Sequence, residues 1–167
     1  MQIDSLRKLY EEELKDLHSM ERQIIQALPK MIKAASNDEL KSSLEEHLQV
    51  TKEQLERLDS IFAQLGKRGQ GKKCKGMEGV LEEGKELLEE DIAPEVLDAG
   101  IIAAAQHVEH YEIAGYGTVV AYARLLGERA AEKLLAQSLV EEKEADRKLT
   151  ELAEATVNAE AEAVAVG

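Results

Sequence analysis

The stretch IIAAAQHVEHYEIAGYGTVVAYARLL, residues 101–126, places apolar residues along one helix face and a carboxylate in the middle of that face. The apolar positions recur every three or four residues, which predicts a long amphipathic helix over about residues 95–126. Glu112 lies at the centre of this stripe. Removing a carboxylate from water is costly, so a buried one needs a proton, a cationic partner or a metal.

Two more predicted helices have acidic residues within their apolar stripes. Glu142 and Asp146 lie on the stripe of a helix over residues 128–157, and Glu21 lies on that of a helix over residues 3–35. No Lys or Arg occurs on these three stripes. A bound metal is therefore the leading explanation for the acids.

Breaks in the helical pattern divide the chain into two hairpins. Ser36-Asn37-Asp38 separates the first helix from a second over residues 39–65, and Gly127 separates the third from the fourth. Between the hairpins lies a crossover with a Gly-rich segment, Gly66 to Gly79, and a short amphipathic helix over about residues 77–91.

This order of elements predicts an all-α fold. It is a ferritin-like four-helix bundle, in which two antiparallel hairpins are joined by a long crossover that contains a short fifth helix. We expect the bundle to occupy residues 1–157 and the Ala- and Glu-rich residues 158–167 to form a frayed tail.

Composition narrows the function classes. With 34 acidic and 21 basic residues among 167, the chain has a formal net charge of −13, which argues against binding a nucleic-acid backbone. No apolar run approaches the ~18 residues needed to cross a bilayer. The single cysteine, Cys74, excludes an internal disulfide. A cytoplasmic protein with no nucleic-acid or membrane partner is expected.

Helix geometry predicts which acids meet. Glu112 and Glu142 lie equally far from the turn between their helices, and Glu109 and Asp146 are matched about one turn further along. Glu21 lies about as far from the turn of its own hairpin. Carboxylates converging at the middle of a bundle suit Fe, Mn or a similar divalent ion.

The second helix contributes less obvious candidates. His47 lies on its apolar stripe, about one turn nearer the hairpin end than Thr51, the residue level with Glu21. His47 is either a hydrogen-bonded core residue or, if the hairpins are staggered, a metal ligand. Outside the stripes, His107 and His110 lie on a small-residue face of the kind that packs helices or subunits.

Three segments support a family resemblance over nearly the whole chain: DLHSMERQIIQALPKM (16–31), HVEHYEIAGYGT (107–118) and EEKEAD (141–146). In them the chain resembles the YciF-like, ferritin-like stress proteins of bacteria. Its Glu109-His-Tyr-Glu112 run is also similar to the paired glutamates of rubrerythrin-type proteins. The resemblance implies a four-helix fold, dimerisation and a dinuclear metal site. Gln49 and Lys52 depart from the acidic and histidine residues that relatives have on the second helix.

The resulting hypothesis is a cytoplasmic homodimer with a dinuclear carboxylate site for a divalent metal, Fe or else Mn or Zn, that handles iron or peroxide under stress. Its expected ligands come from all four long helices: Glu21, Glu109, Glu112, Glu142, Asp146 and His47. The alternative is a non-enzymatic, stress-induced helical dimer whose interior acids are protonated or hydrogen-bonded. In either case the Ala-rich side of the third helix and the short crossover helix are the expected dimer face.

Overall fold

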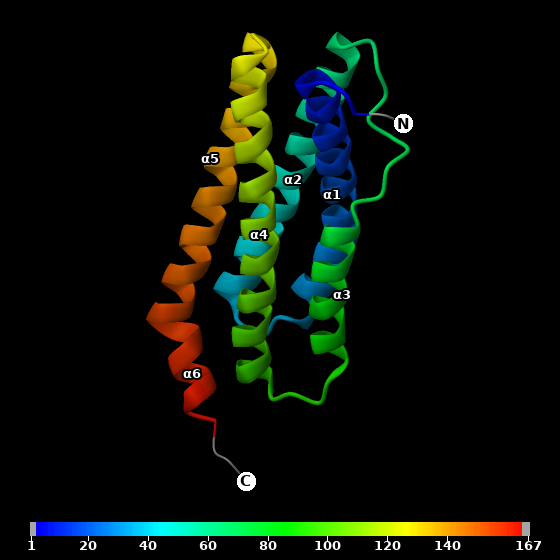
Figure 1. Ribbon diagram of the computed structural model, residues 1–167. Coiled ribbons are helices and arrows are strands. Elements are labelled where there is room, and N and C mark those ends of the chain that lie inside the picture. Colours follow the sequence, from blue (N-terminus) through cyan, green and yellow to red (C-terminus); the bar gives the residue numbers. More distant parts are fainter. Residues whose placement is uncertain (1–2, 165–167) are drawn as a thin grey trace.

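The computed structural model describes residues 3–164, which contain helices and no strand (Figure 1). The helices form two antiparallel hairpins, α1–α2 and α4–α5, with α3 in the crossover between them. Their bounds are α1 Leu6–Ala34, α2 Asp38–Gln64, α3 Lys75–Glu89, α4 Pro94–Leu125 and α5 Arg129–Leu152, continued by a π-helical segment Ala153–Val157 and α6 Asn158–Glu162. The predicted all-α bundle with one long crossover is confirmed.

The hairpin turns follow from local sequence. The Asn37 side chain accepts a hydrogen bond from the backbone N–H of Leu40, 3.0 Å away, and so caps the start of α2. Gly66 after α2 and Gly127 after α4 have positive φ angles of 65° and 75°, which glycine adopts without steric cost. Asn37 thus marks the start of α2, and the two glycines mark the ends of α2 and α4, where the sequence predicts breaks.

A buried aspartate connects the two hairpins. Asp98, in the first turns of α4 and 2% exposed, accepts hydrogen bonds from the backbone N–H and hydroxyl of Ser36, at 2.7 and 2.5 Å, and from the backbone N–H of Asn37, at 2.9 Å. The carboxylate thus fixes the α1–α2 turn against the beginning of α4. This contact sets how far one hairpin is shifted along the other.

The apolar faces of the four long helices meet in one core, and α3 packs against α1 and α4. The core is aliphatic, with two fully buried tyrosines, and includes Tyr10, Leu14, Leu17, Ile24, Leu40, Leu44, Leu58, Ile101, Tyr116, Val119 and Leu135. Buried polar residues near the middle of this core include Glu21, Glu109, Glu112, Glu142 and His47. They form the site described below.

The C-terminal segment is more ordered than the sequence suggested. Residues 158–162 were expected to be part of a frayed tail, but they form α6, which packs against α4. The π-helical segment keeps the helix continuous, with Ala153 and Val157 buried. The last residues of the expected tail, 165–167, lie outside the described part of the chain. None of the helices within residues 3–164 combines the length and apolar character that spanning a bilayer demands.

Candidate metal centre

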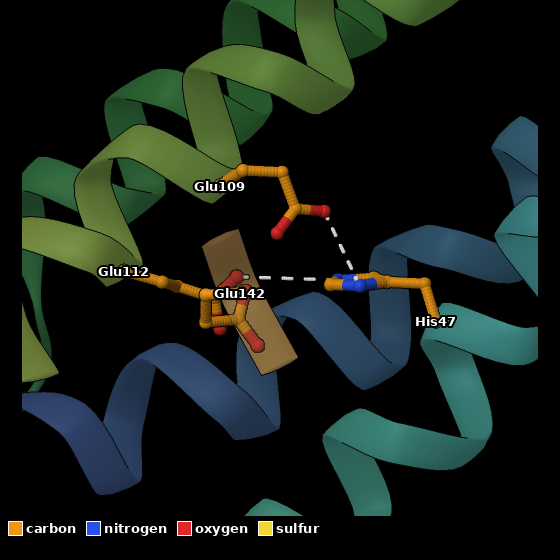
Figure 2. A group of neighbouring side chains, drawn as sticks. All are labelled: His47, Glu109, Glu112 and Glu142. Carbon is orange, nitrogen blue, oxygen red and sulfur yellow. Dashed lines mark ion pairs between the residues drawn. The ribbon is translucent and has the colours of Figure 1, made fainter. Parts of the chain in front are cut away.

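Four buried side chains from three helices converge in the middle of the bundle (Figure 2). His47 comes from α2, Glu109 and Glu112 from α4, and Glu142 from α5. One ligand atom of each lies within 4.8 Å of those of the other three. His47 is 7% exposed, Glu109 is 2% exposed, and Glu112 and Glu142 are fully buried. We call these four side chains the His47–glutamate cluster.

Helix periodicity explains why these side chains face one another. Glu109 and Glu112 are three residues apart on α4, so both point to the same side of that helix. His47 occupies an inward position of α2 one turn after Leu44, and Glu142 occupies one of α5 one turn after Ser138. The histidine therefore lies among the glutamates of α4 and α5.

Several polar atoms of the cluster have no hydrogen-bond partner. His47 Nδ1 lies 3.2 Å from Glu109 Oε1, but His47 Nε2 is 3.9 Å from Glu112 Oε2, which is too far for a hydrogen bond. Both oxygens of Glu112, Oε2 of Glu109 and Oε2 of Glu142 are also unpartnered. Buried polar groups are rarely left in this state. These atoms could instead be metal donors.

Burial and mutual repulsion raise the pKa values of the glutamates in the cluster. Burial, followed by hydrogen bonding and repulsion involving Glu142, raises the pKa of Glu109 well above its usual range. Burial also raises the pKa of Glu112 well above its usual range, and the charges of Glu142 and Glu21 raise it further. Burial lowers the pKa of His47. The histidine is consequently a neutral imidazole near pH 7, the form that binds metals.

Glu21 borders the cluster from α1. It is fully buried, and its pKa is raised to about 8, first by burial and then by the charge of Glu142. The Tyr116 hydroxyl donates a hydrogen bond to Glu21 Oε1, while Glu21 Oε2 has no partner. Glu21 thus lies close enough to the cluster for the charge of Glu142 to raise its pKa, but it is not one of the four converging side chains.

Asp146, like Glu21, is a predicted ligand that lies outside the His47–glutamate cluster. Its side chain is 22% exposed and lies 3.2 Å from His110 Nε2. It also accepts a hydrogen bond from the Gln106 amide at 3.2 Å. Asp146 remains close enough that its charge raises the pKa of Glu109. It therefore borders the centre on its solvent side.

Two residues near the centre were not anticipated from the sequence. Gln54 of α2 is fully buried and donates a hydrogen bond to Glu142 Oε1. Arg57 pairs with Glu141 through its two terminal nitrogens, Nη1 and Nη2, at 2.6 and 2.8 Å. Gln54 lies seven residues after His47, two helical turns along the same face. That spacing was the available signal for Gln54.

The residues present fit a divalent metal. One imidazole nitrogen and several carboxylate oxygens form a donor set suited to Fe, Mn or Zn. The cluster can hold a metal ion while keeping its carboxylates ionised, because the ion supplies the neutralising charge that the buried site otherwise lacks. No lysine or arginine side chain contacts the four residues within the described part of the chain.

Comparison with known proteins agrees with this architecture. The family model described as a domain of unknown function, DUF892, matches residues 5–162. Protein YciF of Escherichia coli strain K12 is 43% identical over 163 residues, which cover 97% of this chain and 98% of YciF.

Solved structures agree as well. The crystal structure of the E. coli stress protein YciF superposes with a TM-score of 0.89 at 43% identity, over 93% of this chain and 99% of that one. YcfI from Rhodopseudomonas palustris gives 0.86 at 43% identity, over 89% and 95% of the two chains. A protein from Xanthomonas campestris shares the fold at 23% identity, with a TM-score of 0.77 over 95% and 97%. The chain therefore belongs to the DUF892 family of YciF-like proteins.

Proposed function

We propose that the protein binds divalent metal at the His47–glutamate cluster and uses it to handle iron or peroxide under stress. The observation that supports this proposal is the set of unpartnered, buried donor atoms in the cluster. Leaving one buried polar group unsatisfied costs about 1–3 kcal/mol. A cation bound among these atoms would remove that cost at several of them together.

Charge balance favours two metal ions over one. Glu21, Glu109, Glu112 and Glu142 carry four negative charges when ionised, and the neutral His47 adds none. Two divalent ions neutralise these four carboxylates. A single ion would leave two charges to be balanced by protons, in a site where burial makes an unbalanced charge expensive.

The surrounding residues orient the donors. Gln54 holds one oxygen of Glu142 and leaves the other free, and Tyr116 does the same for Glu21. Such contacts fix ligand rotamers before the metal arrives. A pair of iron ions held by the cluster would supply the two electrons that, with two protons, reduce one hydrogen peroxide to two water molecules.

The relatives suggest the physiological setting and the main alternative. YciF is described as a stress protein, and a structural role has been suggested for YcfI. The alternative function is accordingly a non-enzymatic, stress-induced dimer whose buried acids keep their protons. In that case the functional form of the protein contains no metal, and the pKa values of Glu109 and Glu112 are raised in that form.

Metal content distinguishes these functions. The protein, purified without a metal-affinity tag and supplied with Fe(II) without oxygen, is expected to retain about two ions per chain after desalting. Glu112→Gln and Glu142→Gln remove ligand charge without changing shape and should abolish retention. The exposed Glu45→Gln on α2 is the matched control. The loaded protein should consume hydrogen peroxide faster than either cluster variant. Metal content near zero in the unmutated protein would refute the proposal.

A further inference from the structure

A groove between α2 and α5 leads from the surface to the His47–glutamate cluster. Its volume is about 200 Å³, and its wall includes His47 itself together with Glu46, Val50, Val140, Glu144 and Lys148. His47 is the most exposed residue of the cluster, at 7%. Its Nε2 has no hydrogen-bond partner. His47 therefore belongs both to the wall of the groove and to the cluster, where its Nε2 lies 3.9 Å from Glu112 Oε2.

A second cavity beside the cluster is much smaller. It has a volume of only about 10 Å³ and lies among Ile24, Leu28, Ala105 and neighbouring apolar side chains, next to His47 and Glu109. That space is at the lower limit for one water molecule. A hydrated cation needs considerably more room, so this cavity offers no comparable route to the cluster.

Charged side chains line the α2–α5 groove in ion pairs. Its three carboxylates are those of Glu46, Glu141 and Glu144. Glu141 is paired with Arg57 and Glu144 with Arg147, so among residues 3–164 Lys148 is the one cation of the groove wall itself. Lys148 Nζ lies 3.0 Å from Glu46 Oε1, so this ion pair connects α2 to α5 at the exposed edge of the groove. Replacing the Lys148 charge would leave Glu46 unpaired and make the groove more negative, and a more negative cleft concentrates cations and accelerates their association.

We infer that the α2–α5 groove is the entrance through which a divalent cation reaches His47, and that the Glu46–Lys148 ion pair limits the rate of entrance. This inference rests on the proposed function, because it assigns a route to the metal of that site. It requires the ion to pass between the apolar side chains of Val50 and Ala145, which line the groove. It also requires Lys148 to repel the ion, so that loading becomes faster when the lysine charge is removed.

The test follows the rate at which cobalt(II) chloride binds to the metal-free protein, using the visible absorbance of bound cobalt in a stopped-flow instrument. Ala145→Phe places a large side chain in the groove and should slow association at least tenfold, with the final absorbance unchanged. Ala130→Phe, at an exposed position of the same helix, is the steric control.

A second variant changes charge and not volume, so it tests the same route without depending on how the bundle packs around a larger side chain. Lys148→Glu should accelerate association about tenfold at low ionic strength, with the gain decreasing as salt is added. Lys143→Glu makes the same charge change at an exposed position of α5 outside the groove and should have a much smaller effect.

The outcomes separate the two proposals. If the unmutated protein gives no cobalt absorbance at equilibrium, the proposed function fails. If it does, but Ala145→Phe and Lys148→Glu load at the unmutated rate, the metal site stands and the entrance through the α2–α5 groove is wrong. Slower loading of Ala145→Phe together with faster loading of Lys148→Glu supports the entrance.

Discussion

Glu112→Met should stabilise the metal-free protein. Glu112 is fully buried and neither of its carboxyl oxygens has a hydrogen-bond partner. Methionine has a similar length and no group that needs a partner. Because an unsatisfied buried polar group costs about 1–3 kcal/mol, we expect the free energy of unfolding to rise by about 2 kcal/mol. In a domain of this size that corresponds to an increase in Tm of about 4–8 °C.

The same substitution should remove stabilisation by metal. A ligand present at a hundred times its Kd stabilises the folded state by about 2.7 kcal/mol. Glu112→Met lacks one carboxylate of the cluster and should not retain metal, so it should lose this gain and end below the loaded unmutated protein, at about 2 against 2.7 kcal/mol. The order of stability therefore reverses: the variant is the more stable protein in EDTA and the less stable one with saturating metal.

Thermal unfolding followed by circular dichroism tests this reversal. Scans of both proteins are compared in EDTA and in excess Mn(II), with Glu45→Met as a surface control that should behave like the unmutated chain in both conditions. The reasoning is refuted if Glu112→Met melts at a lower temperature in EDTA. It is equally refuted if the variant keeps the full increase in Tm on adding metal.

Two further predictions concern pH and the contact between hairpins. The folded-state pKa of Glu21 is raised from 4.5 to about 8, so the folded protein binds more protons than the unfolded chain in this interval, and metal-free stability should fall as pH rises through it. Chemical unfolding in EDTA at pH 5.5 and 8 measures the slope, which Glu21→Gln should reduce; an unchanged slope would contradict the assignment. Asp98→Ala should cost about 3 kcal/mol in unfolding free energy, because the buried donors of Ser36 and Asn37 lose a charged acceptor. The exposed Asp91→Ala is the control, and equal stability of the two variants would show that this contact contributes little.

The fold could be predicted because the signals that determine it are local. Apolar spacing specified the long helices, and Asn37, Gly66 and Gly127 marked the places where helices begin or end. The end of the bundle was harder to predict. Small alanines in residues 153–163 give little contrast between buried and exposed faces, so the sequence did not reveal that α6 packs against α4.

The site could be predicted in part. Matching distances from a turn placed Glu112 and Glu142 together, since the two helices of one hairpin share a reference point. His47 and Gln54 belong to the other hairpin, and the shift between hairpins depends on tertiary contacts such as that of Asp98. Asp146 was misplaced for another reason. Four residues advance an α-helix slightly beyond one turn, enough to rotate Asp146 from the buried position of Glu142 to the edge beside His110.

The division of the cluster between the two hairpins has a consequence for how fast the protein is degraded. The α1–α2 hairpin contributes the imidazole and the α4–α5 hairpin contributes the three carboxylates that surround it. Separating the hairpins disperses these side chains, so under the proposed function an unfolding chain would release the bound metal. A loaded molecule should consequently resist proteases for longer than an empty one, and the metal supply would determine how long each copy survives in a cell.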